Sequence, residues 1–321
     1  MELLRRPAYE GYPAEYLLAR LRGRRAGLGG GGLPPQAGAG GQEPAAALRR
    51  RGAAGGMREA EAWHALRTEF RWVYRQMNGE LRQTFAPLFL WFELRTILLC
   101  LRFRGGNERL KAAALLPASL LAERVQRVLT REGEAATVAD DLAGLLATIA
   151  APCRDLGKLY RQRGGKEFEQ RLATLYLERM AELPLHPVLR AFFRAVIDMR
   201  NLVTLAKQLR WRLHEPRAFI RGGDISPERL GKALEEGTVA ALAALLGALP
   251  DMGALPPAPA NPEPLLYSWL TRKVRRLGRD PLGTGLVLDY LWRCFVEAHN
   301  LSLILQGEER DHEAVRLELI G

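Results

Sequence analysis

Cysteine is scarce in this chain of 321 residues, and this limits the kinds of site that it can form. The three cysteines lie far apart, within or beside apolar runs, and none belongs to a Cys-x-x-Cys pair or has a histidine at metal-ligand spacing. They are Cys100, Cys153 and Cys294. The pattern predicts buried, reduced thiols in a cytoplasmic protein, with no metal site and no cofactor.

Signs of catalysis are equally few. The glycine run at 29–32 has neither a Gly-Lys-Ser/Thr ending nor a preceding strand, so it is not a phosphate-binding loop. No nucleophile and base occur at a suggestive spacing, and we expect no catalytic residue. An enzyme that uses a histidine as its base stays an alternative, although no two of the five histidines lie at helical spacing: His64, His186, His214, His299 and His312.

Lysine is rare although the chain is basic, with a formal net charge of +11 and only six lysines among 47 basic residues. Such a charge raises the possibility of nucleic acid or an anionic membrane surface as a partner. Codon bias in a GC-rich genome explains the high content of arginine, alanine, glycine and leucine at least as well as a phosphate-binding surface does. The basic residues are not interleaved with aromatic residues on one helix face, so we expect no nucleic acid as a partner. A basic helical nucleic-acid-binding protein stays the main alternative.

Long uninterrupted apolar runs are missing too. The N-terminus has no apolar core of signal-peptide length, so we expect no export. The most apolar stretch, Thr84 to Phe103, is interrupted by Glu93 and Arg95. A buried core helix is therefore expected there rather than a membrane span, and any contact with a membrane should be peripheral.

Helical periodicity dominates what remains, and it predicts an all-α protein. Apolar residues recur at three- and four-residue steps from Met57 onward, with breaks where glycine and proline cluster. Residues 8 to 22 also read as a helix, and its apolar positions are Tyr9, Tyr12, Tyr16, Leu17 and Leu21. The predicted division is an N-terminal helix in 1–22, a Gly/Pro-rich flexible linker in 23–56, and helical repeats in 57–150, 151–250 and 251–321, the last preceded by a proline-rich connection.

A short motif recurs at intervals of about one hundred residues: "FELRTILLCLRF", "IDMRNLVTLAKQ" and "VEAHNLSLILQG". Each copy has an acid, then a basic or imidazole group two residues later, then a polar group three residues after the acid. These are Glu93, Arg95 and Thr96; Asp198, Arg200 and Asn201; Glu297, His299 and Asn300. The acid and the polar group share a helix face with the apolar stripe, where a buried polar group is costly unless hydrogen-bonded. We expect them to bond neighbouring helix ends or loops.

Glycine turns follow the motif. "RFRGGNERL" and "IRGGDISPERL" share an Arg-Gly-Gly turn before another helix, and the third copy ends in a single glycine before another helical stretch. The turn glycines are Gly105, Gly106, Gly222, Gly223 and Gly307. Each repeat therefore consists of a long helix, a glycine turn and a shorter helix.

These stretches resemble a known family. "DMRNLVTLAKQLRW" with "FIRGGDIS", "PLGTGLVLDYLWRCFVEAHNLSLILQG", and the N-terminal "EYLLARLRGRRAGL" are similar to the C-subunit family of archaeal and bacterial V-type (A-type) ATPases, which is homologous to the d-subunit of the eukaryotic vacuolar ATPase. The chain departs from the family pattern at Thr96, where asparagine is usual, and at His299, where arginine is usual.

The resemblance implies a pseudo-threefold funnel of three similar helical units. It also implies a non-catalytic central-stalk component, which seats the central shaft on the membrane proteolipid ring and links ATP hydrolysis or synthesis to proton or sodium translocation. Such a protein lies in the cytoplasm, peripheral to the inner face of the cell membrane. Its partners are the central-shaft subunits and the ring.

Overall fold

The computed structural model describes residues 2–27, 59–105, 113–211, 218–253, 261–306 and 318–320. Within these ranges the protein is all-α, as predicted. Extended pairing in the same ranges is confined to two isolated bridges, Leu4 with Leu121 and Tyr12 with Met77. The chain divides into two compact units, which are described separately below.

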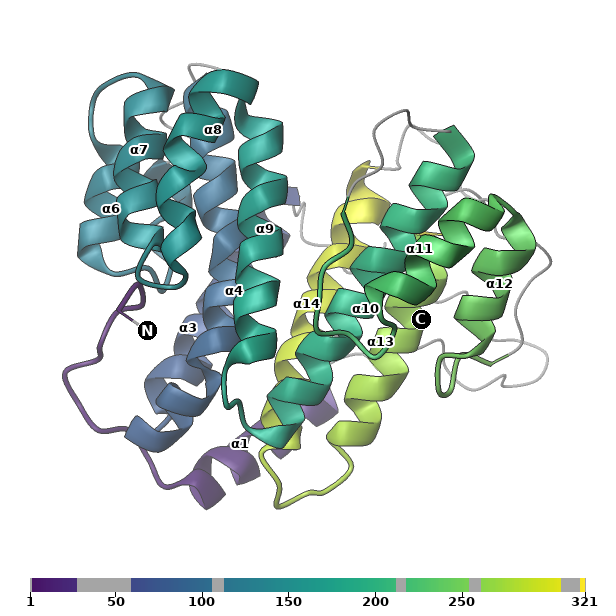
Figure 1. The fold of residues 1–321 in the computed structure, drawn as a ribbon. Coiled ribbons are helices and arrows are strands. Elements are labelled where there is room, and N and C mark those ends of the chain that lie inside the picture. The colour runs from purple at the N-terminus through teal and green to yellow at the C-terminus, as the bar shows by residue number, and fades with distance from the viewer. Residues whose placement is uncertain are drawn as a thin grey trace. The chain divides into compact units, whose positions relative to one another are not determined.

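The first unit comprises Met1–Leu17 and Arg67–Leu189. Its elements, of which the first belongs to it only in part, are α3 (Glu59–Gln76), α4 (Gly79–Gly105), α6 (Glu123–Thr130), α7 (Ala135–Leu146), η1 (Ala151–Asp155), α8 (Leu156–Arg163) and α9 (Gly165–Glu182). Helices α7, α8 and α9 pack in succession, and α4 contacts α7 and α9 (Figure 1). The Tyr176 hydroxyl on α9 donates to the carbonyl of Pro87 on α4, which ties the two helices together inside the core.

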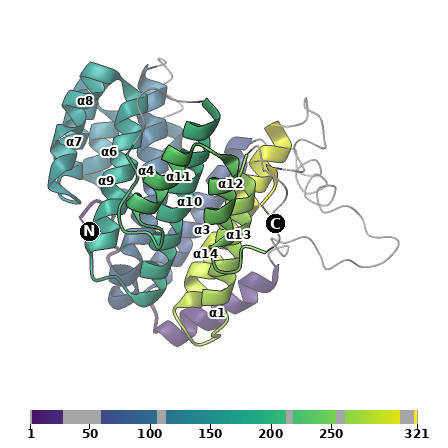
Figure 2. The same ribbon diagram turned by 45° about the vertical axis from the view of Figure 1, so that its right-hand side comes forward.

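The second unit comprises Leu18–Leu66 and Arg190–Gly321. Its helices include most of α1 and α10, and their bounds are α1 (Ala14–Gly27), α10 (Pro187–Trp211), α11 (Pro227–Glu236), α12 (Val239–Gly247), α13 (Glu263–Leu277) and α14 (Gly285–Gln306). Helices α13 and α14 pack side by side, which Figure 2 also shows. In its core, the rings of Phe192 on α10 and Trp292 on α14 meet edge to face at 5.7 Å.

The most apolar stretch forms the buried core helix that the sequence predicts. Among the described residues, the segment Gly79–Arg104 is the one helix long and apolar enough to cross a membrane, but 67% of its most apolar window is buried inside the protein. Phe85, Phe89 and Ile97 on this helix have no exposed surface. The three cysteines are also buried and free, as predicted.

The N-terminal helix differs from the prediction. It begins at Ala14 rather than residue 8 and continues to Gly27, so the first residues of the predicted linker are helical. Tyr9, Tyr12 and Tyr16 are 41%, 42% and 46% exposed, although they were predicted at apolar positions. The physical reason is Pro13, since proline disfavours helical backbone at the residue before it. Residues 28–56 of the predicted linker lie outside the described residues.

Candidate functional site

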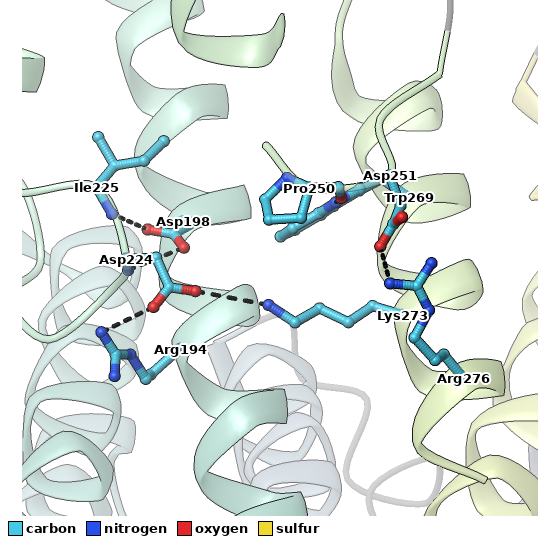
Figure 3. A network of polar contacts seen from close by, with 9 residues as sticks. All are labelled: Arg194, Asp198, Asp224, Ile225, Pro250, Asp251, Trp269, Lys273 and Arg276. Atoms are coloured by element: carbon cyan, nitrogen blue, oxygen red, sulfur yellow. Dashed lines mark hydrogen bonds and ion pairs between the residues drawn. The ribbon is translucent and has the colours of Figure 1, made fainter. Parts of the chain in front are cut away.

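The second copy of the motif fixes a loop to helix α10. Asn201 Oδ1 accepts a hydrogen bond from Ile220 N at 2.8 Å, and Asn201 Nδ2 donates to Ile220 O at 2.8 Å. One turn earlier, Asp198 Oδ1 and Oδ2 accept from the backbone N–H groups of Ile225 and Asp224, each at 3.0 Å (Figure 3). Both side chains are buried. We call this arrangement, in which a buried acid or amide of the motif bonds a downstream loop, a clasp.

Two glycines let the loop approach Asp198. Gly222 has a φ of 98°, a conformation that favours glycine. A Cβ atom on Gly223 would lie 2.2 Å from Asp198 Oδ1, so no other residue fits there without displacing the carboxylate. The Arg-Gly-Gly turn thus brings the N–H groups of Asp224 and Ile225 onto Asp198.

Burial dominates the electrostatics of this clasp. It raises the pKa of Asp198 to about 6, and the nearby Asp224 carboxylate acts in the same direction. The hydrogen bonds from Ile225 and Asp224 and the charge of Lys273 favour the ionised form and lower that pKa. Asp198 therefore titrates in a range that an exposed aspartate does not reach.

An outer set of ion pairs surrounds the clasp and joins it to α13. Asp224 pairs with Arg194 of α10 at 2.7 Å and with Lys273 of α13 at 3.5 Å (Figure 3). The Lys273 ammonium lies 5.3 Å from the centre of the Trp269 ring, and Trp269 Nε1 donates to Pro250 O at 2.8 Å. These contacts link α10 to the loop before α11 and to α13, and they link α13 to the residues that follow α12.

The first copy forms a clasp with the same spacing along the chain. Glu93 Oε1 accepts from Leu120 N at 2.6 Å, and Glu93 Oε2 accepts from Ser119 Oγ at 2.8 Å. These partners lie 26 and 27 residues after the acid, as do the partners of Asp198. Thr96 also hydrogen-bonds Glu93, while burial raises the pKa of that carboxyl.

The third copy repeats the amide half of the clasp. Asn300 Oδ1 accepts from Ile320 N at 3.0 Å, and Asn300 Nδ2 donates to Ile320 O at 2.9 Å. The separation is 20 residues, against 19 for Asn201 and Ile220. Glu297 and His299 are half-buried, and the His299 ring stacks on Tyr267 at 5.7 Å.

The remaining motif positions lie elsewhere. Arg95 and Arg200 lie at exposed positions on α4 and α10. Although its side chain reaches solvent, burial lowers the pKa of the Arg200 guanidinium, and the nearby Tyr267 and Glu263 raise it. Gly105 is the last residue of α4. Gly106 and Gly307 lie outside the described residues.

Sequence reasoning missed one buried acid, Asp289 on α14. Asp289 Oδ2 pairs with Arg25 of α1 at 3.0 Å and with Arg293 at 2.9 Å, although its side chain is only 1% exposed. A Cβ atom on Gly278 would lie 2.4 Å from the Asp289 Cβ, so this helix also packs against a glycine. The signal was present as a single acid inside the apolar run "GLVLDYLW", but this acid lies outside the recurring motif.

The clasps can hold loops in place, and their geometry does not suit acid-base chemistry. Both oxygens of Asp198 and of Glu93 accept hydrogen bonds from backbone or hydroxyl groups of the protein itself. The described residues contain no group of three or more histidine, cysteine, aspartate or glutamate side chains placed to hold a metal ion. These features define a helical scaffold whose buried polar side chains fasten loops to long helices.

Comparison with known proteins identifies the family to which this helical protein belongs. The model of the ATP synthase (C/AC39) subunit family matches residues 56–316, and the chain belongs to that family. It is similar to the V-type ATP synthase C-subunits of two strains of Thermus thermophilus. In each case 28% of residues are identical over 274 residues, which cover 80% of this chain and 75% of the relative.

Proposed function

We propose that this protein is a non-catalytic central-stalk component of a rotary V-type (A-type) ATPase. It joins the central shaft to the membrane proteolipid ring, so that ATP hydrolysis or synthesis is linked to proton or sodium translocation. The observation that carries the proposal is the family match over residues 56–316, a range that contains all three copies of the motif.

The clasps suit a part that transmits torque. An element between shaft and ring must keep one packed arrangement under load, because any yielding of its loops would dissipate the rotation. Buried hydrogen-bonded groups such as Asn201 and Glu93 favour one loop conformation, because moving the loop away would leave these buried polar groups without their partners.

We also infer three structural repeats, in 57–150, 151–250 and 251–321, arranged about a pseudo-threefold axis. The matching chain separations support this division: acid to loop in the first two copies, and amide to loop in the last two. Within such repeats the motif residues are structural. The protein would then lie in the cytoplasm and contact the membrane through the ring.

Assembly of the complex tests the proposal. Membranes are prepared from cells of the source organism with and without this chain, and ATP hydrolysis is assayed in the pellet and the supernatant. We expect loss of the chain to move the hydrolysing head from the membrane to the soluble fraction while the ring stays in the membrane. Unchanged attachment of the head would refute the role, and binding of nucleic acid by the purified chain at physiological salt would favour the alternative function.

A further inference from the structure

A groove of about 780 Å³ lies in the first unit, where residues 2–9, α3 and residues 119–124 meet. The N-terminal segment forms one wall, and Arg5 N donates to Leu120 O at 2.8 Å. Leu120 N in turn donates to Glu93, so the first clasp fixes the segment on which that wall rests. The groove is therefore a formed feature of the unit.

Arginine dominates the lining of this groove. Two glutamates, Glu2 and Glu123, line it together with five arginines: Arg5, Arg6, Arg71, Arg75 and Arg124. The Arg5 guanidinium donates to Leu121 O at 3.1 Å and to Gln126 Oε1 at 2.9 Å. These partners are neutral, so they orient the guanidinium without compensating its charge. Arg6 and Arg75 are exposed.

One nitrogen atom of Arg124, Nε, has no hydrogen-bond partner among the described residues. Arg124 Nη2 pairs with Glu2 Oε2 at 2.9 Å, but Nε is buried. A buried donor without an acceptor costs about 1–3 kcal/mol.

A row of three exposed tyrosines, Tyr9, Tyr12 and Tyr16, follows the N-terminal wall of the groove along the chain. Tyr9 lines it, and the rings of Tyr12 and Tyr16 pack on each other at 4.7 Å. The row is held in place: Tyr12 N donates to Gln76 O at 2.9 Å, and Arg82 Nη1 donates to Tyr9 O at 2.9 Å. Tyrosine and arginine are among the residues enriched in protein interfaces, where rigid aromatic rings lose little entropy on binding.

We propose that the arginine groove and the tyrosine row together form a docking surface for an acidic segment of a partner protein. Carboxylates of the partner pair with Arg6 and Arg75, and its apolar side chains pack on the tyrosines. A forked guanidinium matches a carboxylate in geometry as well as charge. The surface rests on the proposed function in one respect, that the partner is taken to be another component of the same complex.

The aromatic geometry favours a protein over a nucleic acid. Single-stranded nucleic acids bind by stacking bases on open ring faces. Here the guanidinium groups of Arg82 and Arg75 lie 5.6 and 5.9 Å from the centre of the Tyr9 ring, and Tyr12 and Tyr16 cover part of each other. The ring faces are thus partly occupied, whereas the ring edges and the groove stay accessible.

Binding of defined probes to the full-length chain tests the surface. The probes are a short labelled peptide of alternating glutamate and leucine, the same peptide with glutamine in place of glutamate, and single-stranded DNA of similar length. The test variant is Arg6→Gln with Arg75→Gln, and Arg6→Gln alone serves as a milder variant that leaves the Tyr9 contact intact. The matched control is Arg229→Gln with Arg279→Gln, which removes the same charge from exposed positions in the second unit.

We expect the acidic peptide to bind more tightly than the glutamine peptide and the DNA. The double test variant should weaken that binding roughly tenfold, while the control should leave it nearly unchanged. Equal binding of both peptides, or equal loss in test and control variants, would overturn the proposal, as would DNA binding that alone depends on Arg6 and Arg75.

Reconstitution separates this surface from the proposed function. The wild-type chain and the test variant are each mixed with the other purified components of the complex, and incorporation is measured. Failure of the wild-type chain to incorporate would refute the proposed function. Incorporation of the wild-type chain and of the test variant with equal affinity would refute the docking surface alone.

Discussion

Replacing Asn201 with leucine removes one half of a clasp while keeping the number and branching of the side-chain heavy atoms. In the native protein Asn201 satisfies both the N–H and the C=O of Ile220, and Ile220 is itself buried. Leucine leaves both backbone groups without partners. Each unsatisfied buried group costs about 1–3 kcal/mol, and greater apolar burial by leucine offsets part of this, so we expect a loss of about 2–4 kcal/mol in the local stability of the loop.

Hydrogen exchange at the Ile220 amide measures this loss directly, because it reports the opening of the loop. A loss of this size corresponds to an amide that exchanges roughly thirty to a thousand times faster, since about 1.4 kcal/mol is tenfold. Arg210→Leu, at an exposed position of the same helix, is the control and should change exchange little. If Asn201→Leu left the Ile220 amide as protected as in the wild type, the clasp would not be what holds the loop.

Two further changes probe the neighbouring acid. Gly223→Ala should destabilise the second unit by about 2 kcal/mol or more in urea unfolding, because the new Cβ would clash with Asp198. The control is Gly231→Ala in α11, where nothing lies within 4 Å of the new Cβ, and it should stabilise the unit by about 0.5–1 kcal/mol. Similar effects at both sites would contradict this reasoning. The folded pKa of Asp198, about 6, exceeds its ordinary value of 3.8, so the native state binds the proton more tightly. The stability of the wild type relative to Asp198→Asn should therefore fall by up to about 3 kcal/mol as the pH rises from about 4 to 6, and a difference that is flat with pH would show that Asp198 is not perturbed by burial.

The helical fold could be predicted because the recurrence of apolar residues at three- and four-residue steps depends only on neighbouring residues in the sequence. Ser226, for example, comes directly before Pro227, an order typical of a helix start, and the Ser226 side chain accepts a hydrogen bond from Arg229 N at 3.4 Å. The predicted start of α1 was wrong because the periodic spacing of residues 8 to 12 does not reflect Pro13, which disfavours helical backbone at the residue before it. Tyr9 and Tyr12 therefore lie before the helix, and they and Tyr16 face solvent.

The site was predictable only in part. The repeat of acid and amide is visible in the sequence, but its partners lie 19 to 27 residues downstream, and that pairing depends on how the chain folds back. Asp289 was not predicted because it lies outside the recurring motif, and one of its two partners, Arg25, lies far away along the chain. The arginine groove combines residues from three separate segments, so no local pattern could reveal it.

Coupling between ATP hydrolysis and ion movement tests the central claim most directly. The complex is reconstituted in vesicles from its purified components, with and without this chain. ATP hydrolysis and ion uptake are then measured on the same samples. We predict that the catalytic head and shaft continue to hydrolyse ATP without the chain while ion uptake stops, and that adding the chain back restores uptake. Ion uptake that persists without the chain, or hydrolysis by the detached head that strictly requires it, would contradict the account.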